Sequence, residues 1–191
     1  MSGIINASKA AAPSDRLGNP LLAEAEAKVE GNIVDPQVRA DYGKIVVAGL
    51  HIALAKGVEG FAAKLRDSQD PIGDCAKGAA ALVMIMRKEA RGVMSMKAGV
   101  PAGMTLMLHG LDLIDSAGIA KIAEPELDRA TAVFTNELFH RLGITAQMLQ
   151  HMTGRVHQIM QDPGMMQKIN LKAGVTRHAL ADTPTPLPDA G

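Results

Sequence analysis

The stretch 70-DPIGDCAKGAAALVMIMRKEARGVMSM-96 decides the fold that we expect for this chain. Asp70 followed by Pro71 is typical of a helix start, because proline suits the first helical position and an aspartate before it caps free amide groups. Apolar residues then recur at spacings of three and four, which indicates an amphipathic helix. We predict that this helix covers 71–98 and, at 1.5 Å per residue, is about 40 Å long. Its apolar stripe consists of Ile72, Cys75, Ala76, Ala79, Leu82, Val83, Met86, Ala90, Val93 and Met94.

The stretch has too few consecutive apolar residues to cross a membrane. Its longest uncharged run is 78–86, and a bilayer needs roughly 20 apolar residues. The other long uncharged runs, 45–55 and 98–111, also fall below that length. We therefore expect no transmembrane helix.

A second helix, at 101–117, is the neighbour that we expect for the first. Its apolar residues Met104, Met107, Leu108, Leu111 and Ile114 repeat the same spacing. Pro101 follows Gly99 and Val100, which indicates either a kink or a tight turn. We favour the tight turn, which would fold the two helices into an antiparallel hairpin. The small residues at 78–81 would let a neighbouring helix approach closely.

Helix starts and stops recur along the chain. An acidic residue directly precedes proline at Asp35, Asp70, Glu124 and Asp162, and helix-ending glycines follow apolar periods at Gly57, Gly60, Gly118 and Gly143. We predict helices at 20–30, 36–56, 58–67, 71–98, 101–117, 125–142 and 145–161, with a further short helix near 164–173. No segment has the alternation of a strand. The expected fold class is all-α, a single multi-helix bundle with a long central helix and a helical hairpin.

The composition sets the limits of this bundle. Residues 1–18 are expected to form a flexible arm, 19–173 the helical domain, and 174–191 a Pro-rich flexible tail. The chain has no Trp, one Tyr and three Phe but twelve Met, so Leu, Ile, Val, Ala and Met must fill the core. Its 20 basic and 20 acidic residues balance, which argues against binding to nucleic acid through a basic surface. The single cysteine cannot form an internal disulfide.

Cys75 is the first candidate for chemistry. A helix N-terminus can lower the pKa of a thiol, but no histidine lies within one turn of Cys75. On the apolar stripe, a free cysteine is more often a small buried residue. We expect Cys75 to be buried and inert.

Glu137 and His140 form a Glu-x-x-His pair, the spacing that di-iron bundles use for two metal ligands. Such a site needs a second pair of this kind, and no other histidine has a glutamate three residues earlier. A helical metal- or ligand-binding enzyme that uses Glu137, His140 and His151 is therefore the third-ranked hypothesis. We expect no metal, no cofactor and no catalytic residue.

Two further patterns lack the spacing of a binding site. The carboxylates of Asp67, Asp70 and Asp74 do not alternate as calcium ligands do, so we interpret 67–74 as a loop with a helix cap. Gly99 and Gly103 lie four apart, but the segment follows no strand and lacks the Lys-Ser/Thr pair of a phosphate-binding loop.

The methionine-rich faces of the two central helices are the stronger signal. Methionine is flexible and polarizable, and it is common where a surface must accept a partner. These faces are wide, so we expect part of them to bind another chain. The candidate packing and interface residues are Leu82, Met86, Met94, Met104, Met107 and Leu111.

The segments DYGKIVVAGLHIAL, DPIGDCAKGAAALVMIMRKEARG and AEPELDRATAVFTNELFHRLGI give 40–160 a texture of Ala-, Gly- and Met-rich helices with acidic-Pro starts. In this the chain resembles small helical structural and internal virion proteins of tailed bacteriophages, especially short-tailed ones. The resemblance implies a non-enzymatic virion protein, made in the host cytoplasm, that binds copies of itself and other virion proteins during assembly. It implies no sequence-specific nucleic-acid binding.

An alternative within the same resemblance is an internal protein ejected with the genome. Its helices at 36–56, 71–98 and 101–117 would rearrange, insert into the host envelope and form a DNA-conducting channel.

Overall fold

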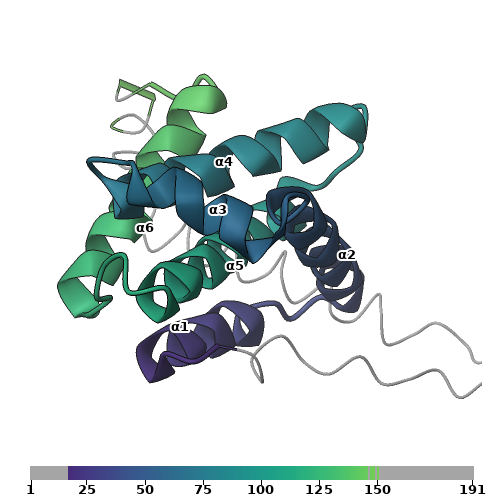
Figure 1. Cartoon of the computed structure of the whole chain (residues 1–191). Coiled ribbons are helices and arrows are strands. Elements are labelled where there is room, and N and C mark those ends of the chain that lie inside the picture. Colours follow the sequence, from purple (N-terminus) through teal and green to yellow (C-terminus); the bar gives the residue numbers. More distant parts are fainter. Residues whose placement is uncertain (1–16, 146, 149, 151–191) are drawn as a thin grey trace, which may run out of the picture. The chain divides into compact units, whose positions relative to one another are not determined.

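The structure, a computed structural model, describes residues 17–145, 147, 148 and 150 (Figure 1). The chain divides after Gly143 into two units, and the described residues of the first contain six helices. These helices are α1 (Pro20–Gly31), α2 (Pro36–Ala53), α3 (Gly57–Arg66), α4 (Pro71–Glu89), α5 (Met96–Ser116) and α6 (Glu124–Arg141). The described residues contain no strand, which confirms the all-α prediction. The predicted helix at 164–173 and nearly all of the one at 145–161 lie outside these residues, as do most of both predicted arms.

α5 is the central helix of this unit. It packs against α1, α2, α3, α4 and α6, so the other helices surround it (Figure 1). Its sequence explains this position, because its only charged residues are Lys97, Asp112 and Asp115, near its two ends. The long stretch between them can be buried on several sides without leaving charge unpaired.

The predicted C-terminal end of the helix at 71–98 is wrong. α4 stops at Glu89, so it has 19 residues and a length of about 28 Å at 1.5 Å per residue. The amide of Arg91 donates to the Lys88 carbonyl and that of Gly92 to the Arg87 carbonyl, each at 2.9 Å, which is the Schellman pattern of a helix end. Arg91 and Gly92 both take positive φ values, of 50° and 79°.

The hairpin prediction is confirmed, but its turn lies at 90–95 and not at the proline. α5 starts at Met96, where the Ser95 hydroxyl accepts a hydrogen bond from the Lys97 amide at 3.2 Å. Pro101 lies inside α5 and costs it one hydrogen bond, which would run to the Lys97 carbonyl. The burial of the rest of α5 outweighs that local cost.

The acidic-Pro starts have mixed outcomes. Asp35 and Asp70 cap α2 and α4 through backbone amides, as predicted. Glu124 is not a cap, because α6 begins at Glu124 itself, and the Glu126 carboxylate accepts from the Ala123 amide at 3.3 Å. Asp162 lies outside the described residues.

The predicted stops at Gly118 and Gly143 are confirmed, since both take positive φ values directly after α5 and α6. Gly60 is not a stop, because it lies within α3, and Gly57 begins α3 after a short turn that follows Ala53.

Gly103 lets three helices converge. A Cβ at this position of α5 would lie 2.5 Å from Val83 Cγ2 of α4 and 2.8 Å from Phe134 Cζ of α6. Phe134 is fully enclosed there, with 1% of its surface exposed. This contact sets how closely α4 and α6 approach the central helix.

Candidate functional site

The predicted interface residues lie mostly inside the bundle. Leu82, Met86, Met107 and Leu111 are buried, whereas Met94 and Met104 are half-buried against the core. Their apolar faces are therefore largely covered by this chain's own helices. Contact with a second chain stays a prediction for these residues: Met104 and Met107 line a concavity of about 580 Å³ between α1, α5 and α6, and Met86 and Met94 line an open groove.

This groove runs between α2 and the end of α4, and we call it the α2–α4 groove. Its volume is about 450 Å³. Ile45, Ala48 and Ile52 form one wall, and Met86, Ala90, Val93 and Met94 form the other. Asp41, Lys44 and Glu89 lie at its polar edge. The groove is thus an apolar channel bordered by both signs of charge.

Val93 is the most exposed large apolar residue of the groove. Its exposed fraction is 86%, and it directly follows the positive-φ pair Arg91 and Gly92. A residue other than glycine in the left-handed region costs roughly 1–2 kcal/mol, and such conformations concentrate at binding sites. The turn that ends α4 therefore leaves an apolar side chain of the groove wall in solvent.

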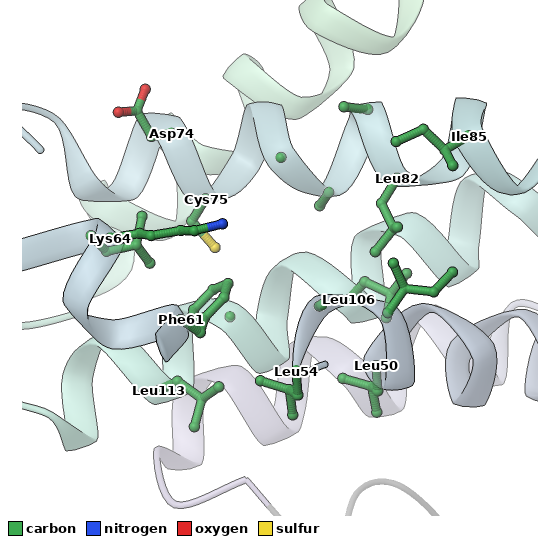
Figure 2. A pocket seen from close by; sticks show the side chains of 17 residues that line it. Leu50, Leu54, Phe61, Lys64, Asp74, Cys75, Leu82, Ile85, Leu106 and Leu113 are labelled. Carbon is green, nitrogen blue, oxygen red and sulfur yellow. The ribbon is translucent and has the colours of Figure 1, made fainter. Parts of the chain in front are cut away.

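A second concavity lies between α2, α3, α4 and α5 and is shown in Figure 2. We call it the Cys75 hollow. Its volume is about 310 Å³, and it shares Ile52 with the α2–α4 groove. The walls are mainly apolar and include Leu50, Leu54, Phe61, Leu82, Ile85 and Leu113. Only Lys64 and Asp74 bring charge to it.

Cys75 belongs to the wall of this hollow and is buried, as the stripe predicts. Its thiol lies 3.8 Å from the Met107 carbonyl, to which it donates. Burial raises the pKa of Cys75 to about 12, so the thiol stays neutral near pH 7. A neutral buried thiol behaves as an apolar residue and is a poor nucleophile.

The Glu137 carboxylate of the Glu137–His140 pair is engaged by Arg141. Arg141 Nε donates to Glu137 Oε1 at 2.8 Å, while the His140 side chain is exposed. Within residues 17–145, 147, 148 and 150, no three His, Cys, Asp or Glu side chains group closely enough to hold a metal ion. His151 lies outside these residues.

The segment 67–74 forms the loop and cap that its spacing predicts. The Asp70 carboxylate accepts from the Gly73 amide at 3.0 Å and from Arg129 at 2.9 Å. These two contacts hold the pKa of Asp70 below its usual range, with the Gly73 amide as the larger cause. The Ser68 hydroxyl donates to Asp74 at 2.6 Å, which closes the loop.

Sequence reasoning missed a polar cluster inside the bundle. Glu26 of α1 is fully buried, and its Oε1 lies 3.1 Å from Nε2 of His109 on α5. Its other oxygen, Oε2, has no hydrogen-bond partner among the described residues. Glu26 and His109 are 83 positions apart. The available signal is a histidine within the uncharged run 98–111, which needs a polar partner once that run is buried.

Tyr42 and Thr105 extend this cluster across α2 and α5. Their hydroxyl oxygens are 2.8 Å apart, and the Tyr42 hydroxyl donates to Glu30 at 3.4 Å. Because a carboxylate only accepts, Thr105 can donate to Tyr42 while Tyr42 donates to Glu30. Burial is the main cause that raises the pKa of Tyr42 far above its usual range, so the phenol stays protonated. The cluster ties α1 and α2 to α5.

The fold and these surfaces define the described part of the chain as an all-helical unit in which α2 and α4 border both the α2–α4 groove and the Cys75 hollow. No protein-family model matches the chain, and neither a curated protein nor a solved structure matches it.

Proposed function

We propose that this chain is a non-enzymatic structural and assembly protein of a bacteriophage virion that acts by self-association. One observation carries the self-association: Val93, in the wall of the apolar α2–α4 groove, has 86% of its surface exposed. Because the exposed apolar side chain and the apolar groove lie on the same surface, the side chain of one copy can fill the groove of a second copy. In a two-fold dimer, Val93 of each copy enters the groove of the other.

The charges around the groove favour a second copy over a strongly charged partner. Its edge carries Asp41 and Glu89 together with Lys44, and Lys44 lies 3.5 Å from Asp41. Because the edge carries both signs of charge, a two-fold rotation can bring acidic residues of one copy next to the basic residue of the other. The whole chain has 20 basic and 20 acidic residues, so two copies do not repel through net charge.

Sedimentation velocity of the full chain over a wide concentration range tests this proposal. We expect a reversible shift from monomer to dimer or higher species as the concentration rises. A chain that sediments as a monomer throughout contradicts self-association.

The bacteriophage setting rests on the resemblance of 40–160 to small helical virion proteins. In that setting, self-association supplies repeated copies in a particle, and other virion proteins bind the remaining exposed faces. The genes that neighbour this one test the setting separately. Portal or capsid genes beside it support the proposal, and an operon of metabolic enzymes contradicts it.

A second candidate function is insertion into the host envelope after ejection, to form a DNA-conducting channel. None of the described helices is by itself long and apolar enough to cross a bilayer. α2 and α3 together reach the necessary length and composition, but the pair is bent by 72° at the break between them. Insertion would need this bend to straighten. Release of dye from loaded vesicles would support it, and intact vesicles at high protein concentration would contradict it.

A further inference from the structure

The shape and lining of the Cys75 hollow suit one flexible apolar chain. An engineered apolar cavity of about 150 Å³ binds benzene. The hollow has about 310 Å³, which is roughly twice that volume. Its walls come from four helices and are mainly aliphatic, with Phe61 at one side (Figure 2).

Cys75 adds to the apolar character of this site. Its thiol proton is directed to the Met107 carbonyl, and the thiol is neutral near pH 7. The wall around it therefore offers a ligand apolar contact, with no reactive thiolate and no second hydrogen-bond donor from this side chain.

Charge at the edge of the hollow selects the head group of the ligand. Asp74 already accepts from Ser68 at 2.6 Å and lies 3.5 Å from Lys77. Lys64 also lines the hollow, and it makes no ion pair within 4.0 Å with a carboxylate of the described residues. Figure 2 shows Lys64 reaching from α3 along the hollow, with its ammonium group near Cys75 in that view. The charge of the lining that remains without a partner is thus the positive charge of Lys64.

We propose that the Cys75 hollow binds an amphiphile with an unbranched alkyl tail and a carboxylate head, the chemistry of a fatty acid. The tail lies among Phe61, Leu82 and Leu113, and the carboxylate pairs with Lys64. This site shares only Ile52 with the α2–α4 groove and does not include Val93, so it stands without the proposed self-association.

Calorimetric titration of the full chain with decanoate, below the concentration at which decanoate forms micelles, tests the site. We expect saturable binding of one decanoate per chain. Decanol should bind more weakly, and decyltrimethylammonium should bind more weakly still, because it brings a cation to Lys64. Equal binding of the cationic and anionic amphiphiles would overturn the proposal. Absence of saturable decanoate binding would overturn the proposal as well. This includes the outcome in which decanoate cannot bind because a second copy of the chain already fills the hollow.

Lys64→Gln tests the head-group contact and should weaken decanoate binding by about three- to fivefold, as for an exposed ion pair. It should leave decanol binding unchanged. Arg66→Gln is the matched control, since Arg66 is a cation of the same helix that does not line the hollow. An equal loss in both variants would overturn the role of Lys64.

Gly78→Leu tests the tail contact. Gly78 lines the hollow, and a Cβ there has no neighbour within 4 Å, so the larger side chain has room and replaces a glycine inside a helix. We expect this variant to fold and to lose binding of both decanoate and decanol. Unchanged binding of both ligands by folded Gly78→Leu would place them elsewhere and overturn the proposal.

Discussion

Oε1 of Glu26 lies 3.1 Å from Nε2 of His109, and this contact joins α1 to the central helix inside the bundle. The exposed fractions of the two side chains are 0% for Glu26 and 12% for His109. Removing one partner of such a buried hydrogen-bonded pair leaves the other unsatisfied, which typically costs about 1–3 kcal/mol and more for a charged group. Replacing both residues by apolar ones leaves no buried polar group without a partner and so removes this cost.

The first prediction follows from this pair. His109→Leu should lower the free energy of unfolding by about 3 kcal/mol, because the Glu26 carboxylate then has no partner for either oxygen. The double variant Glu26→Leu, His109→Leu should recover most of that loss. Urea unfolding of the two single variants and the double variant measures this coupling. Strictly additive losses would show that the two side chains do not stabilise each other.

The second prediction concerns the turn between α4 and α5. Arg91→Gly should raise the free energy of unfolding by about 1 kcal/mol, since glycine adopts a φ of 50° without the penalty of a Cβ. Gly92→Ala should lower it by about 1 kcal/mol, because Gly92 has a φ of 79°. Thermal or urea unfolding measures both. Changes of the same sign in the two variants would contradict the assigned turn geometry.

The third prediction concerns the cap of α4. Asp70→Ala should cost about 1 kcal/mol at pH 7, a typical value for loss of a helix N-cap. Asp70→Asn should keep most of that stability, because an amide oxygen can still accept from the Gly73 amide.

These variants also predict a pH dependence. The pKa of Asp70 is lower in the folded chain than in the unfolded chain, so its charge stabilises the fold fully above the unfolded pKa of roughly 4. This contribution is lost as the pH falls through the lower, folded pKa. The stability difference between wild type and Asp70→Asn should therefore shrink from pH 6 to pH 2. A difference that grows on acidification would contradict the assignment.

The fourth prediction concerns the packing of α4, α5 and α6. Gly103→Ala should destabilise the fold by about 1–3 kcal/mol, because Val83 and Phe134 occupy the space that the new methyl group needs. Gly78→Ala is the matched control, since open space surrounds that position and alanine favours a helix by about 1 kcal/mol over glycine. Chemical unfolding should give opposite signs for the two substitutions.

Local signals in the sequence predict much of this fold. Asp35 and Asp70 stand before prolines and cap helices, and the apolar stripe of α4 is buried where its spacing indicates. The end of α4 escaped prediction because Arg91 takes a left-handed conformation, which is rare outside glycine and depends on the surrounding structure. In the sequence Pro101 is the stronger signal for a break, yet it lies inside α5, whose burial outweighs the lost hydrogen bond.

The candidate sites could be predicted less well than the helices. The Glu26–His109 contact joins residues 83 positions apart, and helical periodicity says nothing about which faces meet. The α2–α4 groove and the Cys75 hollow likewise depend on the spaces that helices leave between them. Met86 and Met94 were identified as interface candidates from composition, but the residue that projects into solvent is Val93.

Sedimentation velocity of two valine variants tests the central claim, self-association through the α2–α4 groove, most directly. Val93→Glu places a charge where the groove of a second copy would bury it, which is costly without a partner. Val34→Glu is the control, because Val34 is 91% exposed and lies outside the groove. We predict that wild type and Val34→Glu associate equally as concentration rises, whereas Val93→Glu stays monomeric. Association of Val93→Glu to the same extent as wild type would contradict the account.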